Sequence, residues 1–267
     1  MITVRELVPS ASLRGIVRSY HYTEMDLGTA SMSKPMTARP EQMMQFALRR
    51  RFTVVDRASG TLSEAPDVVV VGRQTRRNLD LVAVDGLSTL TVHFEPTGFY
   101  RLFHIPMRHL TDLTPDATDV LGPEIRIVHE RVVECRDVTA MIGHIESFLG
   151  ARLDARRPLH PVQRAAAAML DRRNVGDVRA LAADMELSTR QLERAFHDQV
   201  GVGPKLFSRI ARFADALQAK SDQPGRSWAD VAAGAGYFDQ THFIRDCHTF
   251  GSDAPSRLME TWIDCRP

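Results

Sequence analysis

The stretch GAGYFDQTHFIRDCHTFG, residues 234–251, decides the fold of the C-terminal half of the chain. It contains a glycine, Gly236, that can reverse the chain in a left-handed conformation, and an aspartate, Asp239, that can cap the helix after it. Apolar residues then recur at helical spacing, so one side of that helix is expected to pack inward. The inward residues are Phe243, Cys247 and Phe250, and the outward ones are Gln240, Thr241, His242 and Arg245. This pattern predicts a helix-turn-helix unit with a polar outer side.

A second copy of this plan lies upstream in VRALAADMELSTRQLERAFHDQVG, residues 178–201. Ser188 and Gln191 have the spacing of a capping box, in which each side chain bonds to the backbone N–H of the other residue. Leu192 and Phe196 then follow four residues apart, on the inward side of the expected helix. The outward residues are Thr189, Arg190, Glu193, Arg194 and His197. The chain therefore carries two helix-turn-helix patterns.

A single long helix is expected between the two patterns, in GPKLFSRIARFADALQAKS, residues 203–221. Pro204 suits the first turn of a helix, where its missing N–H costs nothing. One apolar stripe runs along the segment through Leu206, Ile210, Phe213 and Leu217. Such a helix is a stiff spacer, and it could hold the two outward helices about 34 Å apart, which is one turn of duplex DNA.

The first 95 residues have the alternation of β-strands. LSTLTVHFE places Leu90, Val92 and Phe94 on one face and Thr89, Thr91 and His93 on the other, outward face. After Pro96 the apolar spacing becomes helical up to about residue 150. This half is expected to be a β-rich barrel or sandwich with closing helices. A barrel pocket would be lined by inward residues, and the same residues would equally fill a core: Phe46, Val70, Leu90, Val92 and Phe94.

The segment ARLDARRPLHP, residues 151–161, is the expected linker, because it is charged, contains two prolines and lacks periodicity. We therefore expect an N-terminal sensing or dimerisation domain over 1–155 and a C-terminal domain over 156–267. The fold class predicted is α+β, with a β-rich domain followed by an all-α domain.

The segment 162–259 resembles the DNA-binding domain of the AraC/XylS family of bacterial transcription regulators. The resemblance is carried by LSTRQLERAFHDQVGVGPKLFSRIARF and AGYFDQTHFIRDCHTFG, in this order and at this separation. The N-terminal part, through VVGRQ and TVHFEPTGFYRLFHIPMRHLTD, resembles the cupin-like sensing domains attached to some of these regulators. The fold implied is a cupin-like domain followed by two helix-turn-helix units on a linker helix.

The resemblance also implies which outward residues contact DNA. Base edges would be reached by Arg190, Glu193 and Arg194 from the first recognition helix and by Gln240, Thr241 and Arg245 from the second. Phosphates or neighbouring bases would be reached by Thr189, Gln191, His242 and His248, and His197 completes the DNA-facing set. Arginine can form hydrogen bonds to guanine, glutamine can form them to adenine, and glutamate can accept one from the cytosine amino group. Contacts to phosphates fix the position of the protein along the DNA without reading the sequence.

The sequence departs from the family pattern in several places. Glu186 stands at a turn position that is often glycine, where a left-handed backbone would cost on the order of 1 kcal/mol. Cys247 and His248 replace an aromatic and a basic residue. From residue 160 onward, 14 Lys and Arg face 14 Asp and Glu, a difference of zero, so only modest non-specific affinity for DNA is expected.

Other interpretations of the same residues remain open at this point. The helices could form an ordinary bundle in which Arg194 pairs with Asp198 at i+4. His21 with Glu24, and His93, could ligate a metal in a cupin-like barrel, although no His-x-His pattern followed by glutamate is present. The alternative function is then a small-molecule-binding or metal enzyme with a helical protein-interaction C-terminus.

Composition narrows the function classes. The formal charge of +1 excludes a binder that relies on bulk positive charge. The cysteines are odd in number, Cys135, Cys247 and Cys265, and this indicates a reducing cytoplasm. The sequence contains no run of about 18 apolar residues, so no membrane span is expected. No nucleophile elbow, zinc-protease, phosphate-loop or dinucleotide motif is present, so neither catalysis nor a cofactor is expected.

The function predicted is that of a sequence-specific, DNA-binding transcription regulator. Its expected partner is double-stranded promoter DNA, with a small-molecule effector of the N-terminal domain and the transcription machinery as further candidates. The sequence leaves open whether the protein is a monomer or a homodimer, and whether it activates or represses.

Overall fold

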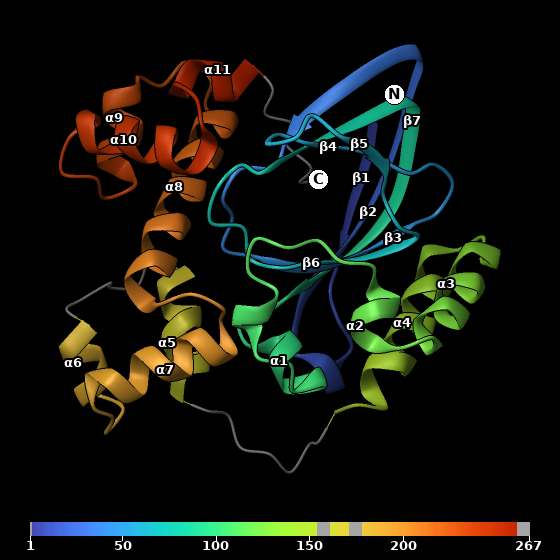
Figure 1. The fold of residues 1–267 in the computed structure, drawn as a ribbon, viewed down its shortest axis with the longest axis horizontal. Coiled ribbons are helices and arrows are strands. Elements are labelled where there is room, and N and C mark those ends of the chain that lie inside the picture. The colour runs from blue at the N-terminus through green and yellow to red at the C-terminus, as the bar shows by residue number, and fades with distance from the viewer. Residues whose placement is uncertain (1, 154–160, 171–177, 261–267) are drawn as a thin grey trace.

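The structure is a computed structural model, and it describes residues 2–153, 161–170 and 178–260 (Figure 1). The first part is an antiparallel sheet of seven strands in the order β1-β2-β7-β3-β6, with β4 added to β7 and β5 to β4. The strands are β1 (Ile2–Leu7), β2 (Val17–Pro35), β3 (Gln42–Ala47), β4 (Thr53–Asp56), β5 (Leu62–Glu64), β6 (Val68–Val71) and β7 (Leu79–Phe94). The predicted β-rich N-terminal part is therefore confirmed.

The long strands β2 and β7 bend and so curl the sheet. The first part of β7 pairs with β4, and its last part pairs with β3. The register between β2 and β7 shifts between Asp26 and Ser31, close to the bend. Gly86 lies there with a φ of 139°, and a Cβ on it would be 2.4 Å from the carbonyl oxygen of Met25. Only glycine allows the two strands to approach so closely.

Helices cover one face of the sheet, and the main core lies between them and the strands (Figure 1). These elements are η1 (Ala11–Leu13), α1 (Gly98–Phe103), η2 (Met107–His109), α2 (Ala117–Leu121), α3 (Glu124–Glu134) and α4 (Val138–Gly150). The five residues that could have lined a pocket or filled a core all lie in this core: Phe46, Val70, Leu90, Val92 and Phe94. For these residues, the core alternative is right.

The opposite face of the sheet encloses a cavity of about 430 Å³. Thr89, Thr91 and His93 line it, so the prediction that these side chains of β7 point outward is wrong. The physical reason is the curl of the sheet, because it turns the face opposite the core into the concave lining of a barrel-like space.

The second part is helical. Its elements are α5 (Pro161–Leu170), α6 (Val178–Ala183), α7 (Thr189–Gln199), α8 (Pro204–Asp222), α9 (Trp228–Gly234), α10 (Gln240–Gly251) and α11 (Pro255–Glu260). Figure 1 shows α8 running between two helical groups, α5 to α7 at one end and α9 to α11 at the other. Each group has its own apolar cluster, and Leu206 of α8 packs against both. The predicted all-α region with a linker helix is confirmed.

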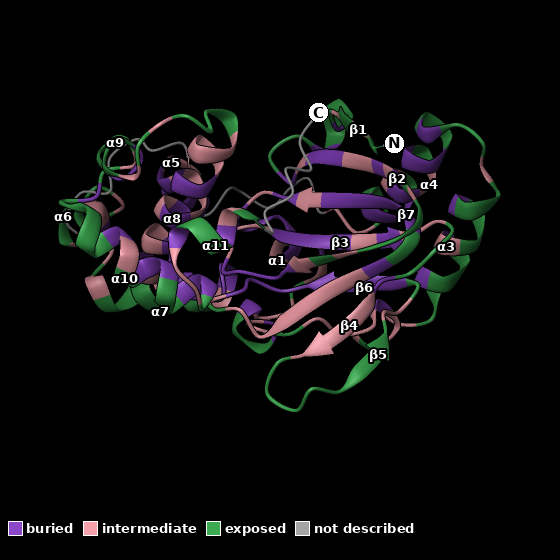
Figure 2. Ribbon diagram, turned by 90° about the horizontal axis from the view of Figure 1, so that it is seen from above, coloured by how far each residue is buried: buried purple, intermediate pink, exposed green. Residues whose placement is uncertain are grey.

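Buried residues follow the predicted stripes (Figure 2). Ile210, Phe213 and Leu217 of α8 are fully buried, as are Leu192 and Phe196 of α7. The predicted linker segment has its middle, 154–160, outside the described residues, so the domain boundary at 155 stays a prediction. Cys265 also lies outside them. Within the described ranges, no helix is long and apolar enough to cross a membrane.

Candidate DNA-binding surface and effector cavity

The first helix-turn-helix unit is formed by α6 and α7. The capping box is present, because the Ser188 hydroxyl accepts the backbone N–H of Gln191 and the Gln191 side chain accepts the N–H of Ser188. Glu186 in the turn has a φ of 56°, which is the left-handed conformation expected at that position. Leu192 and Phe196 bury the inner side of α7 and so fix which residues face outward.

The outward residues of α7 lie on the surface as predicted. Arg190, Gln191, Glu193, Arg194 and His197 are exposed, and Thr189 at the helix start is half-buried. The Gln191 side-chain oxygen is occupied by the cap, so only its amide NH₂ is left for another partner.

The pairing of Arg194 with Asp198 does not occur. Asp198 instead forms an ion pair with Arg108 of η2, in the N-terminal part. A closer partner from outside the helix replaces the i, i+4 pair. Within the part of the chain that the structure describes, the guanidinium group of Arg194 has no ion-pair or hydrogen-bond partner.

The second unit is formed by α9 and α10. Ser227 caps α9 by accepting the backbone N–H of Asp230, and Gly236 reverses the chain with a φ of 78°. Asp239 caps α10 by accepting the backbone N–H of His242 at 2.8 Å. This backbone hydrogen bond holds the pKa of Asp239 below its usual value, because it favours the charged carboxylate.

The outward residues of α10 are also on the surface. Gln240, Thr241, His242, Arg245 and His248 are all exposed. The His242 ring nitrogen Nδ1 lies 2.9 Å from the Asp239 carboxylate, which orients the ring at the start of the helix. Every predicted DNA-facing residue of both helices is therefore accessible, with Thr189 partly so.

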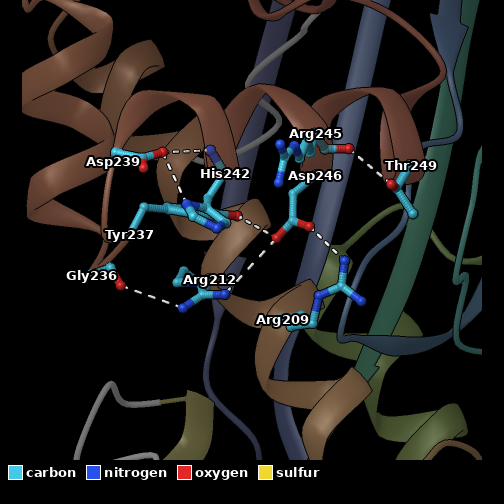
Figure 3. Close-up of polar contacts among 9 residues, drawn as sticks. All are labelled: Arg209, Arg212, Gly236, Tyr237, Asp239, His242, Arg245, Asp246 and Thr249. Carbon is cyan, nitrogen blue, oxygen red and sulfur yellow. Dashed lines mark hydrogen bonds and ion pairs between the residues drawn. The ribbon is translucent and has the colours of Figure 1, made fainter.

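A buried acid fixes α10 against α8 (Figure 3). Although its side chain is charged, Asp246 is only 4% exposed, because it lies on the inner side of α10 between Phe243 and Phe250. Its carboxylate accepts hydrogen bonds from Arg209 at 2.6 Å and from the Tyr237 hydroxyl at 3.1 Å. Arg212 lies 4.0 Å away and also donates to the Gly236 carbonyl in the turn.

The sequence patterns did not predict this network of Asp246, Arg209, Arg212 and Tyr237. The signal that could have revealed it is an aspartate at an inward position of an apolar stripe, because a buried carboxylate requires a cation. The matching cations are Arg209 and Arg212, three residues apart on α8.

The N-terminal part contacts both helix-turn-helix units. The Thr111 hydroxyl donates to the carbonyl of Gly201, just after α7, at 2.9 Å. The backbone N–H of Ala38 donates to the carbonyl of Phe250, near the end of α10, at 2.9 Å. Ala38 is buried within the apolar cluster of the second unit. The Arg73 guanidinium, fully buried, lies 4.9 Å from the ring centre of Phe207 on α8.

The cavity is lined by both apolar and polar side chains. The apolar ones include the methionines Met25, Met36 and Met43. Among the polar ones, the rings of His21 and His93 lie 4.2 Å apart. Burial, then His21 and the nearby cations, hold the pKa of His93 well below its usual value. Those cations are Arg39, Lys34 and Arg18.

The cavity also touches the helical part. Ala214, Asp215 and Gln218 of α8 lie in its lining, together with residues 36–39 between β2 and β3. His21 and His93 share the cavity, but Glu24 accepts a hydrogen bond from Tyr22 and is not part of the lining. Among the described residues, no group of three or more His, Cys, Asp or Glu could hold a metal ion.

These features define a class of protein: two helix-turn-helix units on one linker helix, joined to a β-domain with an internal cavity. Comparison with known proteins supports the helix-turn-helix assignment. Residues 181–261 match a family described as a helix-turn-helix domain, and residues 5–116 match a domain family of unknown function. The helical part therefore contains a helix-turn-helix domain of the AraC type, and this domain makes the protein a DNA-binding regulator.

A solved structure of ToxT shares the fold of this chain. An apo form of a ToxT variant from Vibrio cholerae aligns with a TM-score of 0.50 at 11% identity, over 91% of this chain and 98% of that chain. ToxT from the same organism with bound unsaturated fatty acid gives 0.47 at 11% identity, over 91% and 94%. A probable AraC family transcriptional regulator from Rhodopseudomonas palustris gives 0.32 at 22% identity, over 40% and 95%. No curated protein matches the chain.

Proposed function

We propose that α7 and α10 are recognition helices that read adjacent major-groove segments on one side of duplex DNA. The observation that carries this proposal is that two capped helices, each with an exposed polar side, lie at the two ends of one helix. The 19 residues of α8 span roughly 28 Å at 1.5 Å per residue. That length is close to the 34 Å of one turn of DNA.

We assign the residues by their chemistry and exposure. Arg190, Glu193 and Arg194 of α7, with Gln240, Thr241 and Arg245 of α10, contact base edges. Thr189, Gln191, His197, His242 and His248 contact phosphates or neighbouring bases. The free guanidinium of Arg194 and the exposed side chain of Arg245 support their role as the main base contacts.

The single variants Arg194→Ala and Arg245→Ala test this assignment. Each should lose about 1–3 kcal/mol of binding free energy on a specific duplex, because a bidentate contact to guanine is removed. Each should relax base preference at a different position, and the two positions should lie one helical turn apart. Fluorescence anisotropy on duplexes with single base-pair changes measures both effects.

The matched controls are Arg126→Ala and Arg131→Ala, which remove exposed arginines from α3. They should leave affinity and base preference unchanged. If the Arg194 and Arg245 variants bind more weakly but keep the wild-type preference at every position, both arginines contact phosphates and the base-reading assignment is wrong.

We propose further that residues 1–155 form the sensing domain and 156–267 the DNA-binding domain, and that a small-molecule effector occupies the cavity. The cavity supports this, because residues 36–39 and α8 both line it. Within that segment, Ala38 also bonds to the end of α10. An effector would change the presentation of the recognition helices by its differential affinity for two arrangements.

A thermal-shift screen of small molecules tests the cavity. A ligand that binds only the folded chain raises its apparent unfolding temperature by mass action. Thr91→Phe fills the cavity from β7 and should abolish that shift, whereas Thr118→Val on α2, which lies outside the cavity lining, should keep it. A shift that survives in Thr91→Phe would mean that the ligand binds elsewhere.

Because its partner is DNA, the protein acts in the cytoplasm.

A further inference from the structure

An aromatic side chain stands fully in solvent beside the second recognition helix. Phe238 is 93% exposed and directly precedes Asp239, the N-cap of α10. Its neighbour Tyr237 points the other way, since the residue is only 6% exposed and its hydroxyl donates a hydrogen bond to Asp246. The turn therefore places one aromatic residue in the core and the next one outside it.

Folding does not explain the exposed ring. Within the described part of the chain, its one ring contact is a T-shaped arrangement with His242, with 6.1 Å between the ring centres. Among the described residues, Phe238 is the only aromatic one in the set of exposed large hydrophobic side chains. A phenylalanine that stays in water forgoes the favourable free energy of burying its ring, so this surface is left for a partner.

The location of the ring points to that partner. Residues at the start of a recognition helix lie nearest to base edges in helix-turn-helix proteins. The ring lies next to His242, on the side of α10 that also carries Gln240 and Thr241. In the major groove, the apolar group that bases present is the 5-methyl group of thymine.

We propose that Phe238 contacts a thymine methyl group at one end of the segment read by α10, and so selects thymine at that position. This inference rests on the proposed role of α10 as a recognition helix. The polar residues of α10 read hydrogen-bonding groups, whereas the methyl group distinguishes thymine by shape and apolarity. Burying one methyl group changes affinity by a factor of about four, at roughly 0.8 kcal/mol per carbon.

Replacing thymine by deoxyuridine tests the contact, because it removes only the methyl group. With a duplex selected by the full-length wild type, each thymine in the α10 half is replaced in turn. One replacement should weaken binding of the wild type about fourfold. The same replacement should leave the affinity of Phe238→Ala unchanged, while replacements at other thymines affect both proteins equally.

Two controls separate this result from loss of structure and from loss of the proposed function. Because Phe238 contributes nothing to the core, Phe238→Ala should keep the wild-type unfolding temperature, and Ile127→Ala, an exposed apolar residue of α3, should keep wild-type binding. If the wild type selects no duplex at all, the proposed function fails. If it does, but no thymine gives a Phe238-dependent loss, or Phe238→Ala weakens all duplexes equally, the thymine contact is disproved.

Discussion

Single residues set the direction of each recognition helix. Ser188, Asp239 and Gly236 each perform the local role that their chemistry predicts, as caps or as the turn residue. Glu186 is the exception, since it adopts a left-handed backbone at 56° that favours glycine. The first turn therefore stores strain that the second turn avoids.

This strain predicts the effect of a substitution. Glu186→Gly should raise the free energy of unfolding by roughly 0.5–1 kcal/mol, because relief of the left-handed strain exceeds the added freedom of the unfolded chain. Glu186→Ala keeps a Cβ and should give no such gain. Urea unfolding of the three proteins measures this, and an equal gain in both variants would show that the carboxylate, not the backbone, is the cause.

His93 predicts a dependence of stability on pH. Its pKa is lowered by burial in the folded chain, so the unfolded chain takes up the proton first as the pH falls below about 6.5. Stability linked to His93 is therefore present above that pH and is lost below it. Between pH 7 and 5, the unfolding temperature of His93→Gln should fall less than that of the wild type. Equal falls in both proteins would show that His93 is not the titrating group.

At the scale of elements, periodicity predicted the recognition helices, their outward sides and α8, because each segment has a strong apolar stripe and a cap or proline. Periodicity did not predict the Asp246 network, because the two arginines lie on α8, 37 and 34 residues before Asp246 in the chain. Pairing across such distances is set by packing.

The network predicts a graded loss of stability. Asp246→Asn removes a buried charge that bonds to Arg209, and should cost about 2–3 kcal/mol, since Arg209 remains partly hydrated. Tyr237→Phe removes one hydrogen bond and should cost about 1 kcal/mol. Urea unfolding measures both. A Tyr237→Phe variant less stable than Asp246→Asn would contradict the view that the carboxylate is the centre of the network.

At the scale of the whole molecule, alternation predicted the strands of the sheet and helical spacing predicted the helices that cover it, whereas neither pattern predicted the cavity. Alternation divides the residues of β7 into two faces correctly, but it cannot tell which face meets helices and which becomes concave, because both carry buried residues. His93 was misplaced for this reason. Contacts between the two parts, such as Arg108 with Asp198, were likewise beyond any local pattern.

These contacts predict that the N-terminal part protects α7 from local opening. The double variant Arg108→Ala/Thr111→Val removes an ion pair and a hydrogen bond to Gly201, worth about 1 kcal/mol together after screening. Amide hydrogen exchange in α7 should then be roughly fivefold faster. The control variant Arg131→Ala/Ser147→Ala, on α3 and α4, should leave the exchange rate in α7 unchanged. If the exchange rate in α7 is unchanged in both variants, the contact contributes no protection.

The most direct measurement is selection from a randomised duplex pool with the full-length protein at near-physiological salt. Arg194→Ala/Arg245→Ala and the charge-matched Arg126→Ala/Arg131→Ala are selected in parallel. The wild type and the charge-matched control should enrich a site with two short blocks about ten base pairs apart, and the recognition-helix variant should enrich none. Enrichment of the same two blocks by Arg194→Ala/Arg245→Ala, or of no site by the wild type, would contradict the reading of DNA by α7 and α10.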